Sequence, residues 1–149
     1  MIPVPELSSD NFVFVQASPT IEPHRSSARH ERLKSWLACH ELVLAIYRST
    51  STWPKREQYG LTAQIRRAAY SAAANIAEGS AKRGNREFGR YLDIALGSIA
   101  ELTYILLLAR DLRYLRGEEW GELEALRDHA GRLTWGLYRS VRRGRQAQN

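Results

Sequence analysis

Apolar residues recur every three or four positions along most of the chain after residue 30, a spacing that gathers them on one face of an α-helix. The pattern predicts four helices, at about 30–52, 59–79, 85–114 and 118–143. The connections between them are short, and no useful strand pattern occurs after residue 16. The sequence therefore predicts an all-α fold, an antiparallel four-helix bundle with up-down-up-down topology.

The helix at 59–79 has a stripe built largely from alanine, which allows neighbouring helices to approach closely. Gly79 follows the last periodic residue and is predicted to end this helix. The polar positions form either a binding groove or, as we expect, links between helices, with two of them bonded to the following turn. These positions are Arg66, Arg67, Ser71, Asn75 and Glu78.

The apolar residues of the first and third helices lead to different expectations, a single inward face for the first and an additional exposed apolar surface for the third. For the first helix the predicted inward face is Leu33, Trp36, Leu37, His40, Val43, Leu44 and Tyr47. The second half of the third helix is apolar nearly all round, and such a helix is buried on more than one side. Four helices leave part of it uncovered, so we expect oligomerisation there. The predicted interface residues are Tyr91, Ile94, Tyr104, Ile105 and Leu108.

The two ends of the chain differ in composition from the predicted bundle at 30–143. Residues 1–29 hold four of the five prolines and are predicted to form a disordered tail. Within it, residues 12–15 are an apolar patch that is either passive or packs on a partner or on the bundle. Residues 144–149 are predicted to be a basic and polar tail, and Asn85 is predicted to cap the third helix.

The chain has 149 residues and a net charge of +6, with its excess of cations after residue 30. An up-down bundle brings the start of the first helix, the connection after the second and the end of the fourth to one end. Lys82, Arg86 and Arg90 are four residues apart and are predicted to form a ridge. The predicted nucleic-acid-binding residues are Arg32, Lys34, Lys82, Arg83, Arg86, Arg90, Arg139, Arg142 and Arg143.

Such a cluster favours salt-dependent phosphate contacts, and the alternative is a solvated surface rich in arginine. The other end of the bundle mixes both signs of charge and is a poorer candidate. Tyrosine and tryptophan rings could stack on bases, but at helical spacing we expect most of them in the core or at an interface. They include Tyr59, Tyr70, Tyr91, Tyr104, Trp36, Trp53, Trp120 and Trp135.

The sequence gives little support for a catalytic site or a metal site. The single Cys39 excludes an intramolecular disulfide and a Cys-based zinc site. His40 and His129 are expected to be structural, and Gly79–Gly84 has the glycine spacing of a phosphate loop without its Lys-Ser/Thr. We predict no enzyme activity, catalytic residue, metal or cofactor. A cytoplasmic location is expected, with neither a signal peptide nor a membrane span, because the longest apolar run is 102–109.

The order of several motifs resembles a known bacterial family. The clearest are Trp53-Pro-Lys55, Tyr59-Gly-Leu-Thr62, Gln64-Ile-Arg-Arg-Ala68 and Ala74-Asn-Ile-Ala-Glu-Gly79. They are similar to the four-helix proteins encoded by intervening sequences in large-subunit ribosomal RNA genes, also called the S23 ribosomal protein family. The resemblance covers roughly 31–142. Ala72-Ala73 stands where the family commonly has Ile-Pro, which predicts a straighter second helix.

This resemblance implies a homopentamer, in agreement with the apolar third helix. A related branch is the accessory variability determinant of diversity-generating retroelements, which partners a reverse transcriptase and is inferred to bind nucleic acid. The sequence thus predicts a non-enzymatic oligomer whose basic surface binds RNA or DNA, with a reverse transcriptase as a further partner. The alternative is a protein–protein interaction module without nucleic acid.

Overall fold

The computed structural model describes residues 28–146. Within this range it contains helices and no strand. The elements are η1 (Arg29–Arg32), α1 (Lys34–Thr50), η2 (Lys55–Glu57), α2 (Leu61–Ala81), α3 (Asn85–Asp111) and α4 (Gly117–Gln146). The predicted tails lie largely outside the described residues, as does the apolar patch at 12–15. Residues 144–146 continue α4, so the predicted C-terminal tail begins too early.

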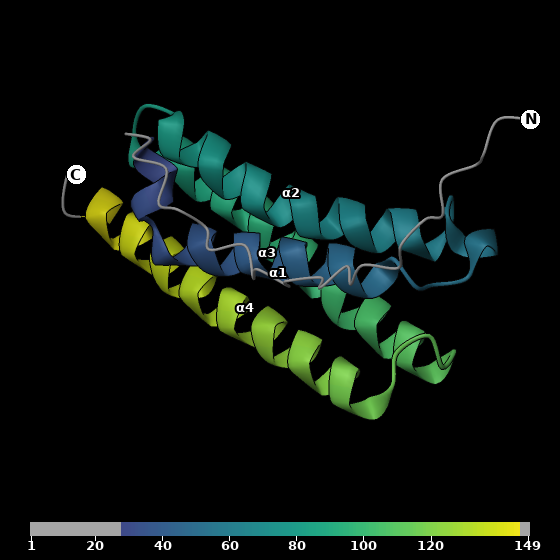
Figure 1. Ribbon diagram of the computed structural model, residues 1–149. Coiled ribbons are helices and arrows are strands. Elements are labelled where there is room, and N and C mark those ends of the chain that lie inside the picture. Colours follow the sequence, from purple (N-terminus) through teal and green to yellow (C-terminus); the bar gives the residue numbers. More distant parts are fainter. Residues whose placement is uncertain (1–27, 147–149) are drawn as a thin grey trace, which may run out of the picture.

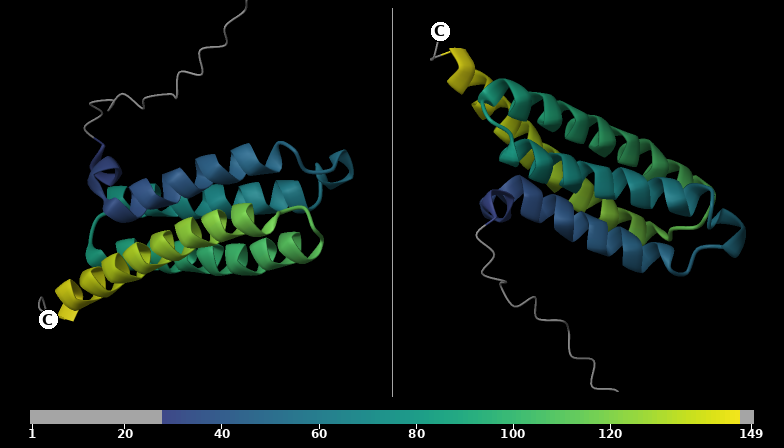
Figure 2. Two further views of the ribbon diagram at one scale, coloured as in Figure 1. Left: turned by 60° about the horizontal axis from the view of Figure 1, so that its bottom comes forward. Right: turned by 90° about the horizontal axis from the view of Figure 1, so that it is seen from above.

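The four α-helices form a bundle in which each packs against two neighbours. Contacts join α1 to α2, α2 to α3, α3 to α4 and α4 back to α1, and consecutive helices run in opposite directions (Figure 1). The C-terminal part of α4 extends past the neighbouring helices (Figure 2). The short 3₁₀ turn η1 lies against α2, because the chain enters the bundle beside the end of that helix.

The predicted stripe of α2 is buried, and its small side chains place α2 close to α3. Ala68, Ala69 and Ala72 are each at most 2% exposed. Gly79 belongs to the same contact, since a Cβ built on it would lie 2.5 Å from Cβ of Tyr91. The prediction that Gly79 ends the helix is therefore wrong. The helix runs on to Ala81, and the glycine with a positive φ of 84° is Gly84.

The inward face predicted for α1 is rotated from the one observed. The residues that α1 buries in the structure are Ser35, Ala38, Cys39, Leu42, Ile46 and Thr50. Of the predicted face, Leu37 and Tyr47 are 50% and 46% exposed. Apolar residues surround much of this helix, and its smallest side chains are the ones that allow α2 and α4 to approach. The large side chains of Trp36 and Val43 cover the edges of the core.

In α3 the residues buried in the core of the bundle include Leu92, Leu102 and Leu106. Ile105 is also buried inside the bundle, so its assignment to an oligomer interface is wrong. Ile94 and Tyr104 are exposed, and Tyr91 and Leu108 are half-buried. By length and composition alone α3 could span a membrane, but one such helix is weak evidence for a span, and 44% of its most apolar window is buried inside the bundle.

Several polar side chains of α2 link it to neighbouring helices, as the sequence predicts. Arg66 Nε donates to Thr50 Oγ1 of α1 at 2.8 Å, and the hydroxyls of Ser71 and Ser98 join α2 to α3 at 2.8 Å. Asn75 Nδ2 donates to the carbonyl of Ser71 in the preceding turn, so the expected bond to the following turn is wrong for this residue. Its geometry is that of a side chain bonding back along its own helix.

Two other polar details differ from expectation. Glu78 accepts a hydrogen bond from Tyr91 OH of α3 at 2.9 Å, not from the next turn. Asn85 lies inside the first turn of α3, where Gly84 precedes the helix and no side chain caps it. At the start of α2, Glu57 accepts from the Leu61 N–H and from Tyr114 OH, and these bonds lower the pKa of its carboxyl group.

The thiol of Cys39 is buried between α1 and α4, 1% exposed, and its sulfur lies 3.8 Å from Thr134 Oγ1. Burial disfavours the thiolate and outweighs the hydrogen bond from Thr134, which stabilises it. The balance raises the pKa of Cys39 from 9.0 to about 11. The thiol is therefore a neutral core group at neutral pH.

Replacing Gly79 with alanine is expected to lower the free energy of unfolding by about 1–3 kcal/mol, because the methyl group forces α2 from α3. The measurement is urea unfolding at fixed protein concentration. Gly121→Ala is the matched control: Gly121 is exposed within α4 with no atom near its missing Cβ, and the change should add up to ~1 kcal/mol. Equal effects of the two substitutions would contradict the close contact.

The pKa of Cys39 predicts an alkaline loss of stability. Below about pH 9 the folded and unfolded states both keep the proton; as the pH rises towards 11, only the unfolded state releases it, so unfolding becomes easier. The loss is on the order of 2 kcal/mol. Unfolding of wild type and Cys39→Ala from pH 8 to 11 measures it, and the difference between the two proteins should shrink with pH. A constant difference would refute the raised pKa.

Candidate nucleic-acid interface

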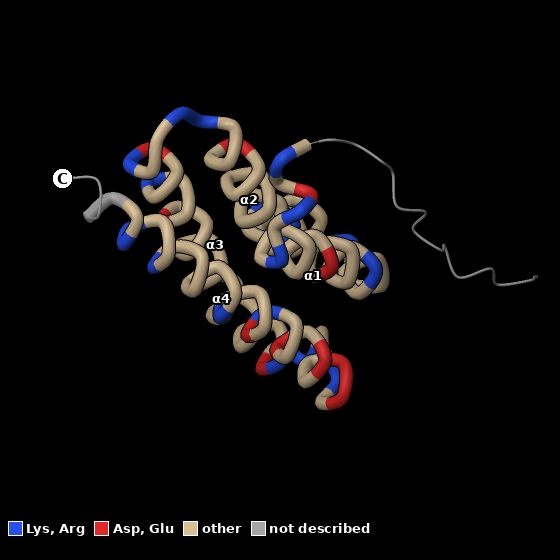
Figure 3. The backbone as a smooth tube through the Cα atoms, turned by 90° about the vertical axis from the view of Figure 1, so that its left-hand side faces the viewer, with Lys and Arg blue, Asp and Glu red and all other residues tan. Residues whose placement is uncertain are grey.

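Three segments distant in sequence meet at one end of the bundle, here called the basic end: the start of α1 with η1, the α2–α3 connection, and the end of α4. η1 packs on α2. The end of α4 lies beside the start of α3, since a Cβ on Gly144 would be 3.0 Å from Asn85 Nδ2. Figure 3 looks onto this end, where Lys and Arg gather on the α2–α3 connection and on the neighbouring helix ends.

Every residue predicted to bind nucleic acid is exposed at the basic end. These residues are Arg32, Lys34, Lys82, Arg83, Arg86, Arg90, Arg139, Arg142 and Arg143. Lys82 and Arg83 stand on a connection of three residues between α2 and α3, which Gly84 completes with its positive φ. A connection of three residues is too short to fold back onto the helices, so both cations stand at the end of the bundle.

The predicted ridge of Lys82, Arg86 and Arg90 does not form, because the helix is interrupted between the first two. Lys82 and Arg90 instead lie against the ring of Tyr91, at 5.4 and 4.7 Å from its centroid. Each also faces an acid: Lys82 Nζ is 3.6 Å from Glu78, and Arg90 Nε is 3.4 Å from Glu87. These two cations are therefore partly neutralised within the chain.

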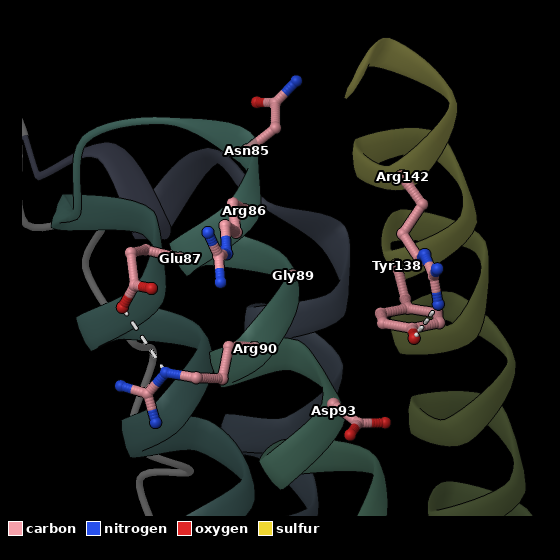
Figure 4. A pocket seen from close by; sticks show the side chains of 8 residues that line it. All are labelled: Asn85, Arg86, Glu87, Gly89, Arg90, Asp93, Tyr138 and Arg142. Carbon is pink, nitrogen blue, oxygen red and sulfur yellow. Dashed lines mark hydrogen bonds and ion pairs between the residues drawn. The ribbon is translucent and has the colours of Figure 1, made fainter. Parts of the chain in front are cut away.

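A groove of about 300 Å³ separates the start of α3 from the end of α4. Arg86 lines it from α3, while Arg142 lines it from α4 and donates to Tyr138 OH at 2.9 Å (Figure 4). Arg90 also borders the groove, but its guanidinium turns towards Glu87 on the far side of α3 from α4 (Figure 4). Arg86 and Arg142 thus line the groove from opposite helices, and the guanidinium of Arg142 folds along α4 over the ring of Tyr138.

The groove also contains groups that sequence reasoning missed. Asp93 points from α3 towards α4 at the inner end of the groove (Figure 4). Its spacing of seven residues from Arg86, two helical turns, is the signal that could have found it. Tyr138 lies one helical turn before Arg142, so helical spacing could have identified this residue as well. An anion would therefore be favoured at the outer end of the groove and repelled near Asp93.

Seven of the nine cations have no ion pair within residues 28–146: Arg32, Lys34, Arg83, Arg86, Arg139, Arg142 and Arg143. Along α4, by contrast, two arginines are paired with acids of their own helix, Arg127 with Glu124 and Arg132 with Asp128. An exposed guanidinium without a carboxylate keeps its full set of donors for an external anion. Across the described residues no group of three His, Cys, Asp or Glu could hold a metal ion.

The aromatic residues divide between core and surface. Trp53 is buried and Trp36 stacks on His40 with centroids 5.0 Å apart, in structural positions. Tyr59, Tyr70, Tyr104 and Trp135 are exposed, so the expectation of core or interface positions is unmet within the single chain for these four. None of them lies among the residues that line the groove of the basic end.

Comparison with known proteins shows the family of this chain and a solved structure with a similar fold. A crystal structure of a protein of unknown function from the S23 ribosomal protein family of Bacteroides thetaiotaomicron VPI-5482 is similar, with a TM-score of 0.65 and 21% sequence identity. The similarity covers 70% of this chain and 95% of that one, and at this identity it shows a shared fold. No curated protein matches the chain.

The family described as 23S rRNA-intervening sequence protein matches residues 31–136, from the start of the bundle well into α4. This span includes the motifs at 53–79 that carried the resemblance, so the predicted family is confirmed. The chain belongs to the 23S rRNA-intervening sequence protein family.

Proposed function

We propose that this protein is a non-enzymatic oligomer whose basic end binds the phosphate backbone of RNA. The observation that carries the proposal is the set of exposed cations without a carboxylate partner in the described residues, gathered from three segments at one end of the bundle. Most of them are arginines, whose planar guanidinium offers several donors to a phosphate. The link of the family to intervening sequences of ribosomal RNA supports RNA as the partner.

Backbone binding of this kind tolerates sequence and weakens with salt, because each phosphate contact releases counterions. The groove between α3 and α4 favours a strand that crosses its outer end, between Arg86 and Arg142, and stays clear of Asp93. An oligomer would repeat this surface and raise the avidity for a long RNA.

A finer proposal places the protein beside a reverse transcriptase, as accessory to a diversity-generating retroelement and its template RNA. It rests on the resemblance to the accessory variability determinant. A reverse transcriptase gene and a repeat pair beside this gene would support it, and a position inside a ribosomal RNA gene would count against it.

The second candidate is a protein–protein interaction module, favoured by the exposed apolar side chains of α3. Ile94 and Tyr104 are exposed there, and both belong to the proposed oligomer interface. If that surface serves only self-association, it is compatible with RNA binding at the basic end. If the basic end binds no RNA, the module is the remaining function.

Charge reversal at Arg86, Arg139 and Arg142 is expected to abolish binding of a labelled RNA hairpin. In wild type, affinity should fall steeply between 50 and 200 mM salt, with a log–log slope near one per phosphate contact. Fluorescence anisotropy measures both. The control reverses Arg48, Arg113 and Arg116, which are exposed away from the basic end and change net charge equally. Salt-independent affinity, or equal losses in both variants, would refute the proposal.

Light scattering should give a mass near five times that of the chain. Ile94→Lys with Tyr104→Lys is expected to dissociate the oligomer, because the two charges enter an apolar interface. Trp135→Lys is the control, since Trp135 is an exposed aromatic residue of α4 outside the proposed surface. A monomer mass for the wild-type protein would contradict the pentamer, and dissociation by the control alone would place the interface on α4.

A further inference from the structure

A second groove lies between α1 and α2, towards the end of the bundle opposite the basic end. Its volume of about 410 Å³ falls within the range of about 300–1,000 Å³ typical of small-molecule sites. The lining residues are Tyr47, Gln58, Tyr59, Thr62, Ala63, Arg66, Arg67 and Tyr70. The set holds three tyrosines and two arginines and no acidic residue, a combination that occurs nowhere else among the described pockets.

Arg66 is held in place without being neutralised. Its Nε donates to Thr50 Oγ1, a buried hydroxyl that itself donates to the carbonyl of Ile46 at 2.7 Å. The guanidinium lies over the ring of Tyr47, 4.7 Å from the centroid. No carboxylate within residues 28–146 pairs with Arg66, although it is half-buried. A fixed cation of this kind is preorganised for an anion, because its side chain has already lost its conformational freedom.

Arg67 adds a second cation beside the first. It donates to the neutral side chain of Gln64 at 3.1 Å and likewise has no ion pair in the described part of the chain. Glu57, an acid near the start of α2, is occupied by the Leu61 N–H and Tyr114 OH. The groove therefore carries two positive charges that nothing in this bundle balances.

The tyrosine rings are available to a ligand. Tyr59 is 91% exposed and Tyr70 64%, and neither has a ring partner in residues 28–146. Large aromatic side chains left open beside guanidinium groups match a ligand with planar rings and anionic groups. Unpaired nucleotides have both, whereas an acidic peptide has only the charge. In a closed duplex the bases already stack on each other, so they are not available to these rings.

We propose that the α1–α2 groove binds unpaired nucleotides of single-stranded nucleic acid. The rings of Tyr59 and Tyr70 stack on bases, and Arg66 and Arg67 contact the flanking phosphates. This site goes beyond the basic end and does not depend on it: from Tyr70 to Lys82, α2 advances about 18 Å along its axis. A folded RNA could offer a stem to one site and a loop to the other.

The experiment measures binding of a fluorescein-labelled uridine tetramer to the full chain by anisotropy. Tyr59→Ala with Tyr70→Ala should weaken binding by about tenfold or more, and the double change to phenylalanine should largely preserve it, because the ring stacks without its hydroxyl. Arg67→Gln should weaken binding and lower the salt slope. The matched control is Trp135→Ala, since Trp135 is an aromatic residue 51% exposed on α4, outside the groove and the proposed oligomer interface.

Two RNAs separate this proposal from the proposed function. The variant reversed at Arg86, Arg139 and Arg142 should still bind the tetramer, and the Tyr59/Tyr70 alanine variant should still bind an RNA duplex. If the wild-type protein binds the tetramer but not the duplex, the result would count against the basic end and leave the groove supported.

Unchanged tetramer affinity in the Tyr59/Tyr70 alanine variant, or an equal loss in Trp135→Ala, would overturn the proposal. If light scattering gives the Tyr59/Tyr70 alanine variant a lower mass than wild type while its affinity for the uridine tetramer is unchanged, the proposal is also overturned. The groove would then be assigned to a second copy of the chain.

Discussion

The close approach of α2 to α3 is the contact on which the rest of the structure depends. Alanines fill the stripe of α2, and at its end Gly79 allows the backbone to lie against Tyr91 and Phe88. With the helices this near, the chain passes from one to the other in three residues, and Gly84 supplies the positive φ that the turn requires. Helix packing thus fixes the place where Lys82 and Arg83 leave the bundle.

Charges are distributed unevenly between the sides of the bundle and its proposed binding surfaces. Along α4, Arg127 and Arg132 pair with acids one turn away. Such surface pairs add little to stability, but they remove those arginines from competition for an external anion. The arginines at the end of α4 have another role in the fold, because cations there are favoured by the helix dipole. Helix stability accounts for their position as well as the proposed RNA binding does.

The sequence predicted the four helices and the core stripe of α2, because α2 has one clear apolar face. It failed for α1, where large apolar residues lie on both sides and Ala38 and Cys39 decide which side is buried. Gly79 was misread because a glycine gives the same signal for a helix end and for a close contact. Lys82 was placed on a ridge because spacing alone assumes an unbroken helix.

The candidate sites show a related limit of sequence reasoning. The arginines of the basic end were identified from topology, because short connections bring helix ends together. Which cations are neutralised depends on side-chain geometry, as for Arg90 with Glu87. For Arg66, the sequence offered a polar link or a binding groove, and the structure provides both at once: the Nε bonds to Thr50 while the rest of the guanidinium remains open.

The entry and exit of the described chain lie at the same end of the bundle, since η1 begins beside the end of α2 and α4 finishes beside the start of α3 (Figure 1). A group attached where the described chain begins or ends would therefore lie next to the arginines of the basic end. A polyhistidine or acidic tag would add its own charge to that surface and distort any measured affinity. The connection at 112–116, at the opposite end, is the place for a label that leaves the surface undisturbed.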